Sequence, residues 1–416
     1  MSNVLKLFLK IIHKRVYGKC EEYISETQFG FRNGMGTRDA LFCLQVLVQR
    51  CMDMGKDVYI AFIDYEKAFD RIKHHKLIHV LRKVGLDDKD TRIIANMYWH
   101  QTANVRVDGE ITEDMEIKRG VRPGCVLSPT LFNICSEEIL AEALNESQEG
   151  IVINGEVINN IRYADDTALL ADSMEGLQIL LSKVYTASKD MGLNMNVSKT
   201  KYMVISKAPL INNIQIKLNN ATIERVLQYK YLGCWMNDKW DLSQEIRVRI
   251  ETARSAFCRM RPVLSNRYIN LKIRIRMAQC YVFSVLLYGL EGWTLTKVLS
   301  NKLEAFELWV YRRILRISWR ERVRNTEVLE RIGKQTEILH KIKVRKLQYF
   351  AHVMRNGKYR ILQLVMQGKI EGRRKPGRRK TSWIKNLREW YGSSTSELFR
   401  AAVSKVQIAM MIANLR

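Results

Sequence analysis

Two patterns of apolar residues alternate along the first half of the chain. One recurs at the spacing of an amphipathic helix, and the other is a short unbroken run of β-branched and aromatic residues, as in a buried strand. The helical pattern predicts two helices within 4–50, around a glycine-rich loop at 28–37, and further helices at 74–102, 128–145 and 174–190. The strand pattern and turn pairs predict strands or hairpins at 58–64, 103–108, 114–118, 151–158, 161–171 and 201–206. The alternation predicts an α+β domain that extends to about residue 236.

The second half of the chain follows helical spacing almost throughout. Between 242 and 350, residues such as Leu303, Phe306 and Val310 fall on one helix face, so we expect much of the apolar content here to form a helix core. The tract 373–380 differs, because it combines six basic residues with the glycine and proline that break helices.

Charge is distributed unevenly between the two halves. The 416 residues carry a formal charge of +26, and residues 241–416 account for +25 of it, with 38 basic and 13 acidic side chains. A hydrophobic fraction of 47% with 27% charged residues is typical of a folded protein and argues against general disorder. A basic excess confined to one half favours an extended polyanion, and therefore nucleic acid, as the partner of that half.

Several other classes of protein are disfavoured by the sequence. The 8 cysteines are scattered and form no C-x-x-C pair, which argues against a zinc module or a disulfide framework. No run of apolar residues is long enough to cross a bilayer, so we expect no membrane partner.

Acidic residues follow two of the predicted strands. Asp64 ends the run at 58–64, and Asp165-Asp166 lies between two apolar arms at 161–171. Carboxylates at such positions need a partner or a cation, and three oxygen ligands would suit Mg²⁺ or Mn²⁺. The alternative is that Asp165-Asp166 merely forms the turn of a hairpin, where aspartate is common.

Five segments share their order and spacing with one known family. They are Phe62-Ile63-Asp64-Tyr65-Glu66-Lys67-Ala68-Phe69-Asp70, Gly120-Val121-Arg122-Pro123-Gly124-Cys125-Val126-Leu127-Ser128-Pro129, Tyr163-Ala164-Asp165-Asp166, Gly192-Leu193-Asn194-Met195-Asn196 with Lys199-Thr200-Lys201, and Tyr229-Lys230-Tyr231-Leu232-Gly233. In this order they resemble the palm motifs and the primer-grip strand of a non-LTR (LINE-type) retrotransposon reverse transcriptase. The resemblance extends over residues 3–390.

The resemblance implies the fold of a right-hand polymerase palm with partial fingers, followed by an all-α thumb and a basic helical C-terminal segment. Its expected boundaries are 1–55 for the fingers, 56–240 for the palm, 241–345 for the thumb and 346–416 for the basic segment. The implied activity is RNA-directed DNA synthesis from an RNA template, a DNA primer and dNTPs, with two-metal catalysis by Mg²⁺ or Mn²⁺.

The resemblance also implies roles for individual residues. Asp64, Asp165 and Asp166 would be the catalytic, metal-binding acids, and Phe69 would be the gate that excludes a ribose 2′-hydroxyl. The other implied nucleotide-binding residues are Arg32, Gly124, Ser128 and Lys199, with Lys201 an equal alternative to Lys199 as the lysine that protonates pyrophosphate. The implied primer and template contacts are Tyr231, Leu232, Gly233, Arg312, Arg313, Arg378 and Arg379.

Two departures from the family pattern lead to an alternative. Pro123 stands where the family usually has a glutamine, and proline offers neither a side-chain amide nor a backbone N–H to the nucleotide. About 60 residues precede Asp64, so we expect an N-terminally truncated copy without an endonuclease domain and with incomplete fingers. The alternative function is therefore an inactive relic that binds RNA or DNA through its basic half. The tract at 373–380 could contact template RNA or act as a nuclear localisation signal, and it favours a nuclear over a cytoplasmic location.

Overall fold

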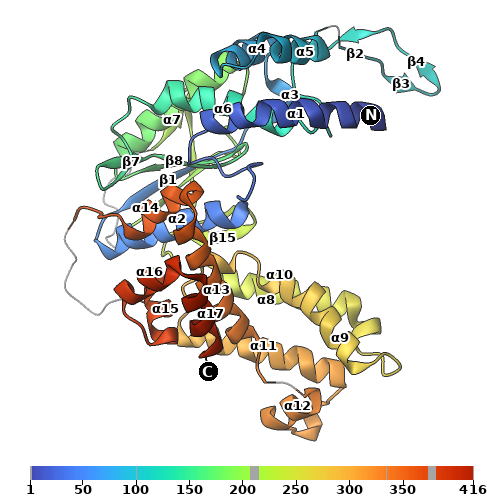
Figure 1. Cartoon of the computed structure of the whole chain (residues 1–416), viewed down its shortest axis with the longest axis vertical. Coiled ribbons are helices and arrows are strands. Elements are labelled where there is room, and N and C mark those ends of the chain that lie inside the picture. The colour runs from blue at the N-terminus through green and yellow to red at the C-terminus, as the bar shows by residue number, and fades with distance from the viewer. Residues whose placement is uncertain (1, 100, 207–214, 334, 373–380, 416) are drawn as a thin grey trace. The chain divides into compact units, whose positions relative to one another are not determined.

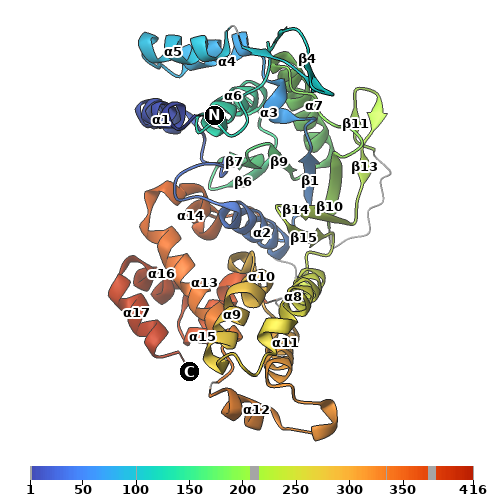
Figure 2. The same ribbon diagram turned by 90° about the vertical axis from the view of Figure 1, so that its right-hand side faces the viewer.

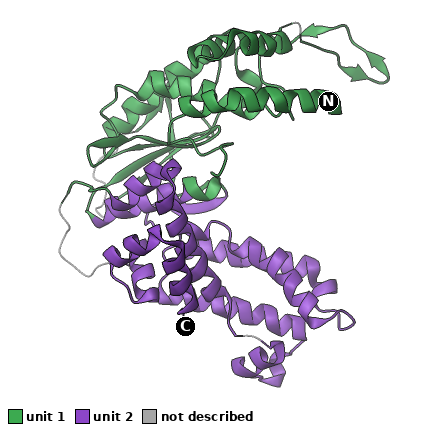
Figure 3. Ribbon diagram, viewed as in Figure 1, with its two compact units in different colours: residues 1–40, 54–232, 368–374 green, residues 41–53, 233–367, 375–416 purple. Residues whose placement is uncertain are grey.

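The computed structural model describes the chain except for residues 1, 100, 207–214, 334, 373–380 and 416 (Figure 1). The chain forms two compact units, and each is built from segments that are separated in sequence (Figure 3). Unit 1 contains residues 1–40, 54–232 and 368–374, and unit 2 contains residues 41–53, 233–367 and 375–416. The expected α+β half followed by a helical half is confirmed.

A five-stranded sheet forms the centre of unit 1. Its strand order is β13-β10-β1-β9-β8, with antiparallel neighbours except for the parallel pair β10 and β13. The strands are β1 (Val58–Ile63), β8 (Asn160–Tyr163), β9 (Asp166–Ala171), β10 (Lys201–Ile205) and β13 (Glu224–Arg225). The unbroken apolar run of β1 is explained by its position, because a central strand is covered on both faces.

Helices cover one face of this sheet. Ala61, Ile63 and Leu169 belong to a core that also contains buried side chains of α6 (Ser128–Leu144) and α7 (Met174–Met191). The other helices of unit 1 are α1 (Asn3–Tyr23), α3 (Ala68–Arg71), α4 (His74–Lys83) and α5 (Asp88–Tyr98). α7 begins at the side-chain cap of Ser173 and ends at Gly192, which adopts the left-handed conformation that favours glycine (φ 97°).

Short hairpins complete unit 1, and those formed by β2 to β5 and by β6 and β7 lie where the turn pairs predict them, whereas the hairpin at 217–222 was not predicted. Their strands are β2 (Thr102–Ala103), β3 (Arg106–Val107), β4 (Glu110–Ile111), β5 (Met115–Glu116), β6 (Ile151–Ile153), β7 (Glu156–Ile158), β11 (Lys217–Leu218), β12 (Ala221–Thr222) and, near the end of the unit, β14 (Gln228–Tyr231). The ribbon formed by β2 to β5 extends away from the helices of this unit (Figure 1).

Unit 2 is almost entirely helical. It contains α2 (Thr37–Asp53) from residue 41 onward, the short strand β15 (Cys234–Asn237) and the helices of the second half. Those helices are α8 (Ser243–Leu264), α9 (Leu271–Ala278), α10 (Ser284–Leu286), α11 (Lys297–Leu315), α12 (Asn325–Ile332), α13 (Ile338–Arg355), α14 (Arg360–Gln367), α15 (Trp383–Tyr391), α16 (Thr395–Val403) and α17 (Lys405–Ala413). α8, α9 and α11 pack together, as do α13, α15 and α16 (Figure 2). In the described part of the chain, no helix has the length and apolar character of a membrane span.

The two units differ from the four segments expected from the sequence. The chain passes from unit 1 to unit 2 between Leu232 and Gly233, rather than at 240/241, and residues 41–53 of the first expected segment belong to the helical unit. Whether the expected segments act as fingers, palm and thumb stays a prediction.

A buried ion pair joins β8 to α6. Arg162 is 1% exposed, and its guanidinium donates to Glu137 Oε2 at 2.7 Å and to Ser25 Oγ at 2.7 Å. Removing one member of such a pair leaves an uncompensated buried charge, which is usually more damaging than removing both.

We therefore predict that Arg162→Met lowers the free energy of unfolding by about 3–5 kcal/mol, whereas Arg162→Met combined with Glu137→Leu lowers it by less. Urea unfolding followed by circular dichroism measures both values. A double variant that is less stable than the single variant would contradict this interpretation of the pair.

Candidate active site

Asp64 directly follows β1, at one end of the central strand. Its backbone is fixed by two hydrogen bonds: its N–H donates to Thr200 Oγ1 at 3.3 Å, and its carbonyl accepts from Asn196 N at 2.8 Å. Its half-buried carboxylate lies 3.8 Å from Lys199 Nζ. The segment 194–200 thus orients the first acid of the site.

Asp165 and Asp166 lie at the hairpin between β8 and β9. Tyr163 pairs with Asp166 across the hairpin, so the turn is centred on Ala164 and Asp165 rather than on the two acids. Ile63 pairs with Thr167 in the neighbouring ladder, and continuing this register by one residue brings Asp64 opposite Asp166. The structure therefore brings the three acids together, and the hairpin-turn alternative does not exclude their convergence.

The pKa values of the acids reflect their burial and their proximity to one another. Burial raises the pKa of Asp166 to about 6, with further contributions from the charges of Asp165 and Asp64. Burial also raises the pKa of Asp165, and the charge of Asp64 raises it further. Within the described residues, the groups that shift these two pKa values include no cation. The pair therefore carries unneutralised negative charge when ionised.

These carboxylates fit a divalent cation by their chemistry. Hard oxygen ligands and uncompensated negative charge are what Mg²⁺ and Mn²⁺ bind. Among the described residues, however, no group of three or more His, Cys, Asp or Glu side chains is arranged so that it could hold a metal ion. A bound ion would need further oxygens, which substrate phosphates supply in sites of this kind.

The structure distinguishes the two candidate lysines. Lys199 faces Asp64, and its side chain is 68% exposed. Lys201 begins β10, and its Nζ lies 2.5 Å from Glu224 Oε2 on the neighbouring strand β13. Lys199 is therefore the lysine that the structure places beside the acids.

Phe69 lies on α3, in a cluster of aromatic rings. Its ring stacks on Phe132, with centroids 4.2 Å apart and planes 13° apart, and meets the edge of Phe31 at 6.2 Å. Phe31 is 47% exposed, and its ring is also 6.2 Å from that of Tyr163, which directly precedes the turn at Ala164 and Asp165. The aromatic cluster thus connects Phe69, the residue expected to exclude a 2′-hydroxyl, to the hairpin that carries Asp165 and Asp166.

The loop at 120–128 packs against α3 through its backbone. Val121 N donates to the Phe69 carbonyl at 2.8 Å, and the buried hydroxyl of Ser128 donates to the Arg122 carbonyl at 2.7 Å. Pro123 and Gly124 are exposed. The Ser128 hydroxyl therefore holds the loop closed, and its contact with a nucleotide stays a prediction, as does that of Gly124.

Arg32 is turned into the protein. Its side chain is buried, donates to Glu21 Oε1 at 3.0 Å and donates to the carbonyls of Ser25 and Gln28 at 2.7 and 3.1 Å. These contacts hold the glycine-rich loop, and a role for Arg32 in triphosphate binding stays a prediction.

Tyr231, in the segment 229–233, contacts the hairpin that carries Asp165 and Asp166. The buried hydroxyl of Tyr231 donates to the carbonyls of Ile161 and Asp166, each at 3.2 Å, so it supports the hairpin from within. Leu232 and Gly233 both have left-handed φ values, 46° and 80°, at the turn that follows β14. Their contacts with a primer stay predictions.

The expected template contacts in unit 2 have different surroundings. Arg312 donates to Asn325 Oδ1 at 2.6 Å, whereas the exposed Arg313 lies over the ring of Trp309, 5.4 Å from its centroid. Arg378 and Arg379 lie outside the described residues.

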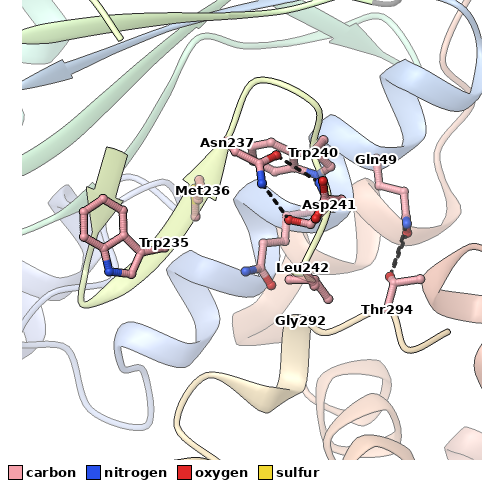
Figure 4. Close-up of a pocket in the computed structure, with 10 residues that line it drawn as sticks. Gln49, Trp235, Met236, Asn237, Trp240, Asp241, Leu242, Gly292 and Thr294 are labelled. Atoms are coloured by element: carbon pink, nitrogen blue, oxygen red, sulfur yellow. Dashed lines mark hydrogen bonds between the residues drawn. The ribbon is translucent and has the colours of Figure 1, made fainter. Parts of the chain in front are cut away.

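Unit 2 also contains a small cavity (Figure 4). Its volume is about 40 Å³, and its walls include Gln49, Trp235, Trp240 and Thr294. A hydrogen bond of 3.2 Å joins Gln49 Nε2 to Thr294 Oγ1 across it. A cavity of this size has room for a few water molecules.

Three residues around the acids were not predicted as site residues. Thr200 is fully buried and accepts from Asp64 N, and Gln28 is fully buried and bonds to the turn at Ala164. The ring of Tyr229 stacks on Phe62 at 4.1 Å, and burial together with the charges of Asp166 and Asp64 raises its pKa to about 12. Tyr229 and Thr200 lie within segments that the resemblance covers, and Gln28 begins the glycine-rich loop at 28–37, but no sequence pattern marks any of the three as a site residue.

Acids at the ends of antiparallel strands, with helices packed behind the sheet, are the arrangement that the resemblance predicts for a polymerase palm. The family described as reverse transcriptase (RNA-dependent DNA polymerase) matches residues 1–236, more than half of the chain. The chain belongs to the reverse transcriptase family, whose members generally use divalent metal ions.

Matches to proteins of insect retrotransposons indicate which kind of reverse transcriptase the chain resembles. The chain is 26% identical over 273 residues to the Retrovirus-related Pol polyprotein from type-1 retrotransposable element R2 of Nasonia vitripennis, covering 62% of this chain and 26% of that protein. It is 25% identical over 314 residues to the RNA-directed DNA polymerase from mobile element jockey of Drosophila melanogaster, covering 73% and 33%. These matches support the LINE-type assignment. The chain spans about a quarter to a third of the length of these two relatives.

Solved telomerase structures overlap with the chain more weakly. Apo telomerase from Candida tropicalis has a TM-score of 0.42 and 14% identity, over 87% of this chain and 62% of that chain. Because this overlap is low, the family assignment rests on the sequence matches.

We predict that Asp64→Asn lowers the pKa of Asp166 from about 6 toward its ordinary value of 3.8, because the substitution removes one of the repelling charges. A ¹³C NMR titration of labelled aspartate carboxyls in metal-free buffer measures this pKa. Asp190→Asn, which changes an exposed acid paired with Lys76, is the matched control and leaves the pKa unchanged. An equal pKa in wild type and Asp64→Asn would show that the acids do not interact.

Proposed function

We propose that this chain is the polymerase part of a LINE-type reverse transcriptase, which copies an RNA template into DNA. The observation that carries the proposal is the convergence of Asp64, Asp165 and Asp166, two of which have raised pKa values, at the ends of β1 and the β8–β9 hairpin. The reaction joins the primer 3′-oxygen to the α-phosphorus of a dNTP and releases pyrophosphate.

Asp64, Asp165 and Asp166 would hold Mg²⁺ or Mn²⁺. Divalent ions held there would lower the pKa of the attacking 3′-hydroxyl and neutralise charge on the leaving pyrophosphate. The contribution of the chain itself is rigidity: hydrogen bonds to Thr200, Asn196 and Tyr231 fix the strand ends before substrate arrives.

Two further side chains take part in the proposed reaction. Lys199, beside Asp64, donates a proton to the pyrophosphate oxygen that leaves the α-phosphorus. Phe69, held between Phe31 and Phe132, presents a rigid apolar edge that disfavours a 2′-hydroxyl on the incoming sugar.

The substrates and partners follow from this assignment. RNA template, DNA primer and dNTP are the proposed ligands of the acids and of the residues around them. The charge of +25 in residues 241–416 supports binding of a nucleic acid duplex by the helical half.

Primer extension on poly(rA)/oligo(dT) with Mn²⁺ or Mg²⁺ tests the proposal. We predict that wild type incorporates dTTP and that Asp165→Asn lowers the rate at least about a hundred-fold, since several kcal/mol of transition-state stabilisation depend on the ions. Asp190→Asn, an exposed acid of the same unit, retains the wild-type rate. Intact RNA binding without any incorporation by wild type would instead support the inactive relic.

A second prediction separates the two lysines. Lys199→Ala lowers kcat about ten-fold or more, because it removes the proton donor to pyrophosphate, while Lys201→Ala leaves kcat unchanged because Lys201 is paired with Glu224. Single-turnover incorporation of dTTP measures both rates. A larger loss in Lys201→Ala than in Lys199→Ala would overturn the assignment.

A further inference from the structure

The start of the glycine-rich loop lies beside β8, the strand that leads to the catalytic turn. Arg162 N donates to the Thr27 carbonyl at 2.9 Å, and Phe29 N donates to the Arg162 carbonyl at 2.9 Å. Gln28 and Arg162 form a parallel bridge. Residues 27–29 thus extend the sheet along its β8 edge for a short distance.

The side chain of Gln28 then reaches the catalytic turn itself. Its Oε1 accepts from Ala164 N at 2.9 Å and from Gly30 N at 2.9 Å, while its Nε2 donates to the Ala164 carbonyl at 3.4 Å. Gln28 is fully buried, and Ala164 directly precedes Asp165. One amide group therefore binds both backbone polar groups of the residue before the acids.

The backbone at this contact is constrained in two ways. Ala164 has a φ of 58°, which an L-residue other than glycine adopts only at an energetic cost, so surrounding contacts must hold it there. A Cβ at Gly30 would lie 2.3 Å from Ala164 N, so only glycine permits this approach. The sequence Gln28-Phe29-Gly30 provides both the amide and the missing side chain.

We propose that Gln28 is a positioning residue for the reaction: its side-chain amide clamps Ala164 and so fixes the turn that carries Asp165 and Asp166. The inference rests on the proposed polymerase function. Gln28 itself cannot touch substrate because it is fully buried, so it acts through the turn. The acids must hold their places to within fractions of an ångström, and small displacements can lower a rate about a hundred-fold.

Asn133 provides a matched control. It is also a buried amide, and its Nδ2 donates to the Gly30 carbonyl at 2.7 Å. It holds the same loop to α6 but makes no hydrogen bond to Ala164 among those of the described residues. Asn133→Leu therefore loosens the loop without releasing the turn, which separates positioning from general support of the fold.

The experiment compares Gln28→Met, Gln28→Glu and Asn133→Leu with wild type. Gln28→Met keeps the size of the side chain but removes every hydrogen bond of the clamp, whereas Gln28→Glu keeps an oxygen acceptor for both amides. Three quantities are measured: kcat and KM for dTTP on poly(rA)/oligo(dT), the dissociation constant of Mn²⁺ alone by electron paramagnetic resonance of free Mn²⁺, and stability in urea.

We expect Gln28→Met to lower kcat at least about ten-fold with KM within about three-fold of wild type, and to weaken Mn²⁺ binding at least about five-fold. Gln28→Glu recovers part of kcat, and Asn133→Leu changes kcat and Mn²⁺ binding less than about three-fold. Equal losses of kcat in Gln28→Met and Asn133→Leu, or wild-type values in Gln28→Met, would overturn the proposal.

Two further outcomes are also decisive. If Gln28→Met does not fold, Gln28→Leu, which also removes every hydrogen bond of the clamp, replaces it in the comparison, and a kcat no lower than that of Asn133→Leu overturns the clamp. If wild type extends no primer, the polymerase function fails, whereas the Mn²⁺ measurements still test whether Gln28 orders the acids.

Discussion

Three carboxylates that meet at the ends of neighbouring strands oppose the folding of unit 1, because burial removes water from them and their like charges repel. This burial and this repulsion raise the pKa values of Asp165 and Asp166. Contacts on the surrounding backbone overcome this opposition to folding. Segment 194–200 holds Asp64, and the Tyr231 hydroxyl holds the carbonyl of Asp166. The sheet thus keeps in place a concentration of charge that a cation can neutralise.

The part of this site that could be predicted from sequence is the part that is local. An unbroken apolar run that ends in Asp64, and two apolar arms around Asp165-Asp166, predict strands and their ends directly. The fold class follows from the alternation of such runs with helical spacing, and the structure confirms it. The strand order, by contrast, depends on pairings between distant segments, which the apolar pattern does not specify.

Side chains whose roles depend on distant partners could not be predicted. Lys199 and Lys201 are equivalent in sequence, and only the pairing of β10 with β13 turns Lys201 toward Glu224. The resemblance implies a nucleotide-binding role for Arg32, and only the structure shows that Glu21 on α1 pairs with its guanidinium inside the protein. Gln28 gains its importance from Ala164, 136 residues further along the chain.

The division into two units also depends on contacts between segments that are far apart in the sequence. α2 lies near the N-terminus, but Phe42 packs edge-on against Tyr349 and Trp383, with ring centroids 5.0 and 5.1 Å away. These contacts make α2 part of the helical unit that contains the end of the chain. A boundary drawn along the sequence cannot assign such a helix, because its core partners are about 300 residues away.

Fewer basic side chains of the helical half are free to bind phosphate than its formal charge suggests. Arg274 is buried and donates to the Ile314 carbonyl at 2.8 Å, and the ammonium group of the fully buried Lys346 lies against Trp383, where burial lowers its pKa well below 10.5. Such side chains hold helices together and cannot each release a counterion from a phosphate. Arg313, whose guanidinium lies 5.4 Å from the ring centroid of Trp309, is exposed at the surface, whereas Arg254, which lies over the same ring at 5.2 Å, is half-buried. The salt dependence of nucleic acid binding should therefore reflect the exposed arginines rather than the formal charge of the half.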